Sequence, residues 1–259
     1  MMLYNLLREY RSELQKKYSP STAETYYKRL ALLFAGQNVS DTVGKLDVQL
    51  VLDKLSEIKY KNYFSQTKNA FLQFCKQYHI KLSSDTLKKI EELSKSTKKR
   101  HRRLKTVRYN QIDRQIKHLR NMKLKLSYQT ILATGLRVSE LSAIMPSDCR
   151  VSDDSITFSF TGKGRKNGTV TAMAEDSPVL YERLKLLIKD TFPDKKVFYS
   201  AVMLQKKASE LGFGCHDLRR AFAKIEYQKC RNKAEVSKKL RHSDKRTTNI
   251  YLNSKVDIK

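Results

Sequence analysis

The chain has 259 residues, of which 53 are Lys or Arg and 26 are Asp or Glu, so its formal net charge is +27 at pH 7. This length favours two domains of ordinary size, and the excess positive charge favours a polyanionic partner, above all nucleic acid. The sequence has no run of about eighteen apolar residues, no signal peptide and no single basic amphipathic helix, which argues against a membrane partner. We therefore expect a cytoplasmic protein that binds nucleic acid, and association with the nucleoid if that nucleic acid is DNA.

The cysteines argue against a secreted or zinc-stabilised protein. Cys75, Cys149, Cys215 and Cys230 are scattered along the chain, without the close pairs that structural zinc sites use. They are also too few to stabilise a secreted domain of this size through disulfides. We expect reduced thiols.

Residues 1–94 predict a small all-helical domain with basic outer faces. Apolar side chains recur at helical spacing in four segments, which span residues 3–14, 23–34, 48–58 and 67–78. Ser21 and Glu24 have the spacing of a capping box, which predicts the start of the second helix.

Residues 95–108, "KSTKKRHRRLKTVR", contain eight Lys or Arg and no acidic residue. This composition predicts a linker. We interpret it as a basic strap that follows a phosphate backbone while the two domains close around a duplex, with Lys99, Arg100, Arg102 and Arg103 as DNA-binding residues. A solvated, disordered tether is the alternative.

Residues 109–259 predict a mixed second domain, so the expected fold class is mainly α with a small β-sheet. A helix is expected around residues 124–132, and further helices around 180–188, 202–211, 218–225 and 234–240. Between them, "DDSITFSF" and "GTVTAMA" have strand character, and "TGKGRKNG" predicts a hairpin turn that carries Lys163 and Lys166.

Three stretches contain polar residues that are suited to phosphate chemistry. "LATGLRVSEL" places Arg137 inside an apolar helical run, three residues before Glu140. "HDLRRAF" holds His216 and Arg219 on one edge of a helix, and "LRHSDKRTTNIYLN" holds His242 and Tyr251. Each residue taken alone is more often structural than functional.

Together these motifs, in this order and spacing, resemble the tyrosine recombinases, also called the phage integrase family. The resemblance covers the whole second domain, and "SPSTAETYYKRLALLF" also resembles the core-binding domain of that family, although less specifically. It implies a helical core-binding domain followed by a mixed α/β catalytic domain.

The resemblance also implies a set of catalytic residues. Arg137 and Arg219 would bind the scissile phosphate of DNA, which suits guanidinium groups because they form directional, charged hydrogen bonds to nonbridging oxygens. Tyr251 would be the nucleophile and His216 would accept or return its proton. His242 would donate a hydrogen bond to the phosphate.

The remaining roles concern the hairpin and the helix that follows Arg137. By the family pattern Lys163 would be the general acid for the departing 5′ oxygen, with Lys166 as its rival in the same turn and a candidate DNA contact. Glu140 would hold a basic side chain in place, and an ordinary ion pair is the alternative. No metal site and no cofactor are expected, because the sequence shows no cluster of carboxylates.

Three positions depart from the family pattern. Arg220 stands where many members have a second histidine, and Arg241 stands where a glycine usually precedes the second active-site histidine. Only eight residues follow Tyr251, whereas many relatives carry a further helix that docks on a neighbouring subunit.

The resemblance implies a site-specific recombinase that cleaves and rejoins DNA through a 3′-phosphotyrosyl intermediate, for integration, excision or resolution of DNA elements. Its expected partner is double-stranded DNA with an inverted-repeat core site. We expect a monomer or weak dimer when free and a tetramer on two synapsed sites. The alternatives are a type IB topoisomerase-like enzyme and a catalytically idle DNA-binding protein of the same fold.

Overall fold

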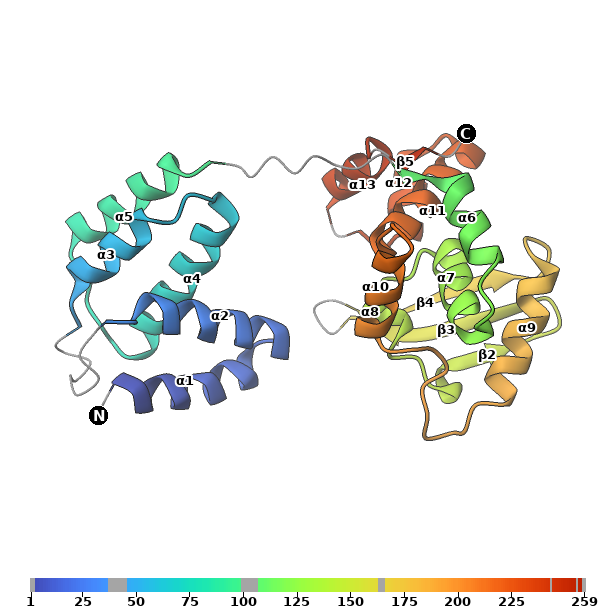
Figure 1. Cartoon of the computed structure of the whole chain (residues 1–259), viewed down its shortest axis with the longest axis horizontal. Coiled ribbons are helices and arrows are strands. Elements are labelled where there is room, and N and C mark those ends of the chain that lie inside the picture. The colour runs from blue at the N-terminus through green and yellow to red at the C-terminus, as the bar shows by residue number, and fades with distance from the viewer. Residues whose placement is uncertain are drawn as a thin grey trace. The chain divides into compact units, whose positions relative to one another are not determined.

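The computed structural model describes residues 3–36, 46–98, 107–162, 166–242, 244–254 and 256–257. The chain divides into two compact units, Met1–Arg103 and Leu104–Lys259, which are described separately (Figure 1). Within the described ranges, no helix is long and apolar enough to cross a membrane.

Unit 1 is helical throughout its described part. Its helices are α1 (Leu3–Lys17), α2 (Pro20–Leu33), α3 (Val48–Ser56), α4 (Lys61–Gln77) and α5 (Ser84–Ser96). An aromatic cluster lies in its core, where the Phe74 ring centroid is 5.1 Å from that of Phe34 and 5.3 Å from that of Tyr10. These rings come from three segments that are distant in sequence, so their burial holds α1, α2 and α4 together.

Two features of unit 1 differ from the sequence prediction. Helix α2 begins at Pro20, after Ser19 as the N-cap, so the expected capping box of Ser21 and Glu24 is wrong. Glu24 instead accepts a hydrogen bond from Arg11 at 2.8 Å. Helix α5 was not predicted, because only Ile90 among its side chains is fully buried and its apolar period is correspondingly weak.

Part of the predicted linker is regular structure. Lys95 and Ser96 form the end of α5, and Val107–Arg108 forms β1. The four basic residues that were predicted to contact DNA, Lys99, Arg100, Arg102 and Arg103, lie outside the described residues.

Unit 2 combines helices with a small antiparallel sheet. Its elements in chain order are β1 (Val107–Arg108), α6 (Tyr109–Lys117), α7 (Met122–Thr134), α8 (Val138–Leu141), the 3-10 turn η2 (Pro146–Asp148), β2 (Cys149–Val151), β3 (Ser155–Thr161), β4 (Asn167–Met173), α9 (Pro178–Lys189), α10 (Ala201–Glu210), α11 (Cys215–Cys230), α12 (Lys233–Lys239), α13 (Lys245–Leu252) and β5 (Val256–Asp257). The expected fold class, mainly α with a small β-sheet, is therefore confirmed.

The sheet has the strand order β2-β3-β4, and Phe158 lies opposite Val170 in the β3–β4 pair. Ile156, Phe158 and Phe160 alternate along β3 and are buried, whereas the residues between them are more exposed. This alternation places one face of the hairpin on the core of the unit and leaves the other face toward solvent.

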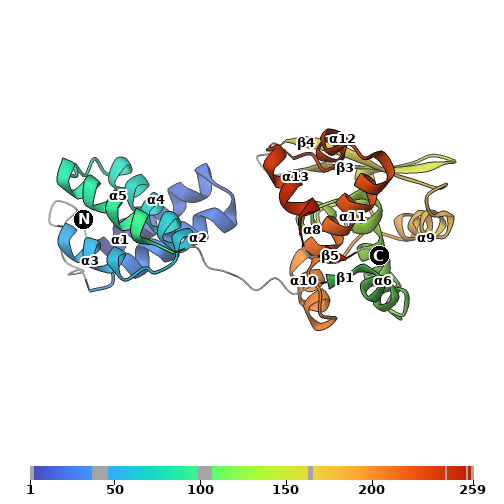
Figure 2. The ribbon, with the colours of Figure 1, turned by 90° about the horizontal axis from the view of Figure 1, so that it is seen from above.

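Helix α11 is the central helix of the C-terminal half of unit 2. It packs against α7 and, together with α12 and α13, forms the group of helices seen side by side in Figures 1 and 2. The last described strand, β5, pairs in parallel with β1 through Val256 opposite Val107. This pairing joins the last described residues to the beginning of the same unit.

Candidate active site

Arg137 lies in the break between two helices, not inside one helix as predicted. Helix α7 ends at Gly135, which has a left-handed φ of 63°. A Cβ at this position would come within 2.5 Å of the Phe222 ring, so both the backbone conformation and the packing require glycine. Arg137 is then the N-cap of α8, and its side chain remains partly exposed.

Glu140 is the carboxylate that fixes Arg137. It is 2% exposed, and its Oε1 lies 2.5 Å from Arg137 Nη1 while its Oε2 accepts the Arg137 backbone N–H at 2.8 Å. Arg241 Nη2 lies 3.4 Å from the same Oε2. Burial by itself would raise the pKa of Glu140, but these hydrogen bonds and charges hold it below its ordinary value.

Arg219 is buried between the turn at Gly135 and the turn at Leu240. It is 1% exposed, and its guanidinium donates to the carbonyl oxygen of Gly135 and, at 2.5 Å, to that of Leu240. Burial and the positive charge of Arg137 lower the pKa of Arg219 to about 10, so the group remains charged at neutral pH. One side chain therefore joins the turn that precedes Arg137 to the turn that precedes His242.

His216 occupies the first turn of α11. Asp217 stabilises this turn, because its carboxylate accepts the Gly214 N–H at 2.9 Å and pairs with Arg220 at 2.8 Å. Burial, followed by the charges of Arg220, Arg219 and Arg137, lowers the pKa of His216. The imidazole is therefore neutral near pH 7 and is able to accept a proton.

His242 follows the C-terminal turn of α12. The His242 N–H donates to Ser237 O at 3.0 Å and the Arg241 N–H donates to Lys238 O at 2.9 Å, a Schellman arrangement in which Arg241 has a φ of 54°. The imidazole Nδ1 lies 2.8 Å from the hydroxyl of Thr248, on α13. Burial and the charges of Arg219, Arg137 and Arg241 lower the pKa of His242 to about 4.

Tyr251 projects from α13 toward both histidines. Its ring centroid is 4.8 Å from that of His242 and 6.4 Å from that of His216, and Arg220 Cζ lies 6.0 Å from it. Tyr251 is 8% exposed and packs among Phe222, Ala223, Val236 and Leu240. The stretch between His242 and Tyr251 was not predicted to be helical, whereas the structure forms α13 here, begun by Asp244 as its N-cap.

The structure thus brings together Arg137, Glu140, His216, Arg219, His242 and Tyr251, which are far apart in sequence. Several buried nitrogen atoms of this cluster are unsatisfied. Arg219 Nε and His242 Nε2, together with Arg220 Nε and Arg241 Nε, have no hydrogen-bond partner among the described residues. Buried donors of this kind favour an anionic ligand, since an unpaired buried polar group costs about 1–3 kcal/mol.

Only one of the two hairpin lysines lies among the described residues. Lys163 lies outside the described residues. Lys166 is exposed and directly precedes β4, and its carbonyl oxygen accepts the Gly162 N–H at 2.7 Å, so the described ends of the turn are close together.

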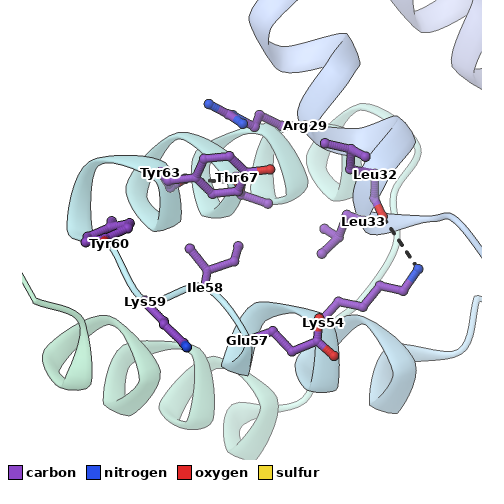
Figure 3. A pocket seen from close by; sticks show the side chains of 10 residues that line it. All are labelled: Arg29, Leu32, Leu33, Lys54, Glu57, Ile58, Lys59, Tyr60, Tyr63 and Thr67. Atoms are coloured by element: carbon purple, nitrogen blue, oxygen red, sulfur yellow. Dashed lines mark hydrogen bonds between the residues drawn. The ribbon is translucent and has the colours of Figure 1, made fainter.

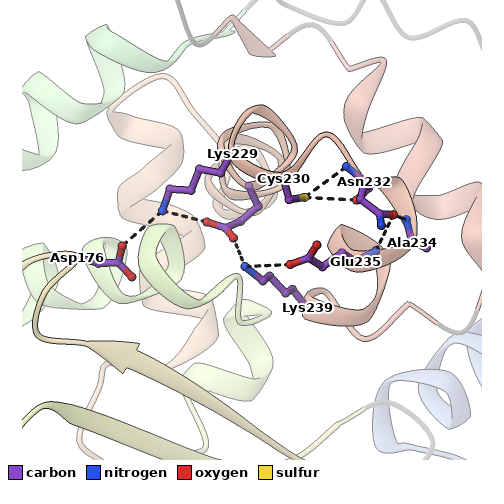
Figure 4. Close-up of polar contacts among 8 residues, drawn as sticks. Asp176, Lys229, Cys230, Asn232, Ala234, Glu235 and Lys239 are labelled. Carbon is purple, nitrogen blue, oxygen red and sulfur yellow. Dashed lines mark hydrogen bonds and ion pairs between the residues drawn. The ribbon is translucent and has the colours of Figure 1, made fainter.

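An ion-pair network fixes α12 against α11. Glu226, buried on α11, lies 2.5 Å from Lys239 Nζ and 3.3 Å from Lys229 Nζ, and Asp176 and Glu235 pair with the outer sides of these lysines (Figure 4). Because α12 ends in the turn that carries His242, this network positions the histidine indirectly. Glu226 and Thr248 were not predicted from the sequence, since polar contacts between separate elements have no sequence period. Asp217 was also missed, although its contacts with Gly214 and Arg220 are local.

A separate pocket of about 550 Å³ lies in unit 1. It combines Leu32, Leu33 and Ile58 with Tyr63, whose ring centroid is 3.5 Å from Arg29 Cζ (Figure 3). None of the residues predicted for catalysis lines this pocket. In addition, no group of three His, Cys, Asp or Glu side chains suited to a metal ion is found within the described parts of the chain.

Comparison with known proteins identifies the architecture. The model of the phage integrase family matches residues 104–257, whereas no curated protein sequence matches the chain significantly. Among solved structures, the lambda integrase (75–356) dimer bound to a COC′ core site has a TM-score of 0.69 at 15% identity and covers 98% of this chain and 96% of its own.

Two further structures share the fold. The XerH site-specific recombinase bound to difH has a TM-score of 0.62 at 19% identity and covers 93% of this chain and 81% of its own. The Tn1549 transposon integrase (aa 82–397) in complex with circular intermediate DNA has a TM-score of 0.60 at 15% identity and covers 95% and 94%. These matches include both units, so a helical core-binding domain followed by a mixed catalytic domain is confirmed, and the chain belongs to the phage integrase family of tyrosine recombinases.

Proposed function

We propose that this protein is a site-specific DNA recombinase that cleaves and rejoins strands through a 3′-phosphotyrosyl intermediate. The observation that carries the proposal is the position of Tyr251, whose ring lies beside His242 and His216. The arginines around it include buried nitrogen atoms that have no hydrogen-bond partner among the described residues. A phenol nucleophile next to an anion-binding cluster suits attack on a phosphodiester.

Arg137 and Arg219 are the phosphate clamp in this proposal. Attack on phosphorus adds negative charge to the nonbridging oxygens, and positioned guanidinium donors stabilise that charge more in the transition state than in the substrate. The Arg219 guanidinium is immobilised by two carbonyl oxygens, and its Nε has no hydrogen-bond partner among the described residues. Arg137, whose side chain is 27% exposed, is held by Glu140 at the open side of the site.

The histidines provide proton transfer and a neutral donor. The lowered pKa of His216 keeps its imidazole neutral, so it accepts the proton from the Tyr251 hydroxyl as the oxygen bonds to phosphorus. When the Thr248 hydroxyl donates to Nδ1 of His242, the proton of the neutral ring lies on Nε2, which has no partner among the described residues. This N–H then donates to a nonbridging oxygen.

Cleavage breaks the bond between phosphorus and the 5′ oxygen, and Lys163 gives that oxygen a proton. The tyrosyl phosphodiester retains the energy of the broken bond, so a 5′ hydroxyl can attack it in the reverse reaction without a nucleotide. The chemistry needs no metal in this scheme, because the guanidiniums neutralise the transferred phosphate.

The proposed substrate is duplex DNA with an inverted-repeat core site, contacted by both units and the basic residues 95–108. The formal charge of +27 supports such a partner. The solved relatives bound to a COC′ core site and to difH support the same partner class. In this proposal, four subunits act on two synapsed sites.

A suicide-substrate assay tests the proposal. The protein is incubated with a library of duplexes nicked near their centres, so that cleavage releases a short fragment and traps any covalent adduct for detection on a denaturing gel. We expect an adduct with the parent and none with Tyr251→Phe, while both proteins bind DNA equally well. Tyr227→Phe is the matched control, because Tyr227 packs against the same apolar cluster.

Strand exchange between two synapsed duplexes separates recombination from the alternatives. An enzyme that relaxes supercoiled DNA but exchanges no strands would be topoisomerase-like. A protein that binds DNA and forms no adduct on any duplex of the library would be an idle member of the family, and the proposal would be wrong.

A further inference from the structure

Arg241 has a backbone conformation that favours glycine. It lies at the left-handed position that ends α12, with a φ of 54°, where glycine or asparagine is favoured because a larger side chain strains the backbone. An arginine at such a position is strained, and interactions of its side chain with neighbouring groups offset part of this cost.

The Arg241 guanidinium makes these interactions with three other groups. Its Nη2 lies 3.4 Å from Glu140 Oε2, its Nη1 donates to Lys239 O at 3.1 Å, and its Cζ lies 4.8 Å from the centre of the Phe160 ring on β3. A Cβ on Gly168 would come within 3.0 Å of Phe160 and 3.7 Å of Arg241 Cδ, so this glycine leaves the space that the stack occupies.

These contacts give Glu140 two cationic partners. Its Oε1 pairs with Arg137, and its Oε2 is shared between the Arg137 backbone N–H and Arg241. If Glu140 paired with Arg137 alone, one negative and one positive charge would cancel beside the phosphate. A second guanidinium on the same carboxylate restores net positive charge to this side of the site and fixes the rotamer of Glu140.

We propose that Arg241 is a positioning residue: it holds Glu140, and through it Arg137, while it joins the His242 turn to β3 next to the hairpin turn. This role rests on the proposed recombinase function. Arg219 joins the Gly135 turn to the Leu240 turn through two hydrogen bonds. Arg241 follows Leu240 and pairs with Glu140, so it connects the same two parts of the chain a second time, on the side of the sheet. Both turns are then fixed relative to each other at two points.

The test separates the guanidinium from the backbone. Arg241→Asn and Arg241→Gly both suit a left-handed residue but lack the charge, whereas Arg241→Lys keeps the charge with the backbone strain. At saturating suicide substrate, we expect the single-turnover cleavage rate to fall at least about tenfold in the Asn and Gly variants. The cleavage rate of the Lys variant should lie between that of the parent and those of the Asn and Gly variants, although its backbone is more strained than theirs.

Arg231 provides the matched control. It is an exposed arginine that ends α11 with a left-handed φ of 52°, so Arg231→Gly makes the same backbone change away from the site. We expect Arg231→Gly to cleave at the parental rate. Melting temperatures of all variants show whether any loss of rate follows a loss of folding.

A double-mutant cycle with Glu140→Gln tests whether Arg241 acts through Glu140. We expect Arg241→Asn to lower the rate less than about twofold in the Glu140→Gln background, because the carboxylate it positions is already gone. Equal losses of cleavage rate in both backgrounds would overturn the role of Arg241, and so would parental rates in Arg241→Asn and Arg241→Gly. Neither outcome would affect the proposed recombinase function. A parent protein that forms no adduct would overturn the recombinase function and this role together.

Discussion

The two arginines of the proposed clamp differ in how strongly the fold depends on them. Arg219 is buried and supplies hydrogen bonds to the carbonyl oxygens of Gly135 and Leu240, whereas Arg137 is partly exposed and is paired with Glu140. The sequence motif presents both as phosphate-binding groups. Their surroundings show that one of them also supports the structure.

Arg219→Ala should therefore lower the free energy of unfolding by about 2–5 kcal/mol, because two buried carbonyl groups lose their donors. Arg137→Ala should lower it less, by about 1–3 kcal/mol, because the buried Glu140 carboxylate keeps Arg241 and the backbone N–H of residue 137 as partners. Each substitution should slow cleavage at least about a hundredfold. Urea unfolding and single-turnover kinetics measure the two effects. Equal losses of stability in the two variants would contradict this division.

His242 should make the stability of the protein depend on pH. Its pKa is about 4 in the folded protein and about 6.5 in the unfolded chain, so the unfolded state binds more protons between these values. Stability should then fall as the pH is lowered from about 6.5 toward about 4, by at most about 3 kcal/mol from this residue.

His242→Asn, which does not titrate, should show a smaller decrease in the free energy of unfolding over the same pH range. Measurement of urea unfolding across this range gives the comparison, and His216 contributes equally to the parent and the variant. If the free energies of unfolding of the two proteins changed in parallel with pH, the pKa of His242 would be the same in the folded and unfolded states, which would contradict this prediction.

At the scale of elements, the sequence predicted those whose apolar side chains repeat along the chain. Helices α7 and α9 to α12 and the β3–β4 hairpin follow this rule, since Ile156, Phe158 and Phe160 alternate visibly and Leu218 and Phe222 share a helix face. Helices α5 and α13 were missed, because few of their side chains are buried and their starts depend on the caps Ser83 and Asp244.

Other errors arose where long-range packing overrides local pattern. Arg137 was placed within a helix because "LATGLRVSEL" is largely apolar, yet the Phe222 ring excludes any side chain at Gly135 and the helix ends there. The pairing of β1 with β5 joins two-residue segments from opposite ends of unit 2, which no local period reveals. The candidate site residues were predicted because the order and spacing of their motifs resemble the phage integrase family.

The β3–β4 hairpin is expected to deliver the general acid. A 5′-bridging phosphorothiolate leaves without protonation, so it should restore cleavage to the variant that has lost the acid and leave other defects uncorrected. We expect the phosphorothiolate to restore cleavage by Lys163→Ala to near the parental rate. It should accelerate cleavage by Lys166→Ala no more than it accelerates cleavage by the parent. Rescue of Lys166→Ala alone would assign the acid to Lys166.

At the scale of the whole molecule, the basic segment between the units should bind phosphates without reading sequence. Replacing Lys99, Arg100, Arg102 and Arg103 with Ala should weaken binding to specific and random DNA by similar factors. The slope of log K against log[salt] should decrease by about 0.9 for each phosphate that the variant no longer neutralises.

Salt titrations of the parent and the variant on both kinds of DNA measure this effect. An unchanged slope would mean that the segment is a solvated tether. A weakening confined to the specific site would mean that it reads bases or groove shape.

The proposed mechanism depends most on the covalent bond between Tyr251 and DNA. The direct measurement is to trap the adduct on a suicide duplex, digest it with protease and nuclease, and locate the remaining nucleotide by mass spectrometry. We expect a single modified peptide from α13, in which a nucleotide is joined through its 3′-phosphate to the Tyr251 oxygen. Tyr227 should carry no modification. A nucleotide on any other residue, or a 5′-phosphate linkage to Tyr251, would contradict the mechanism.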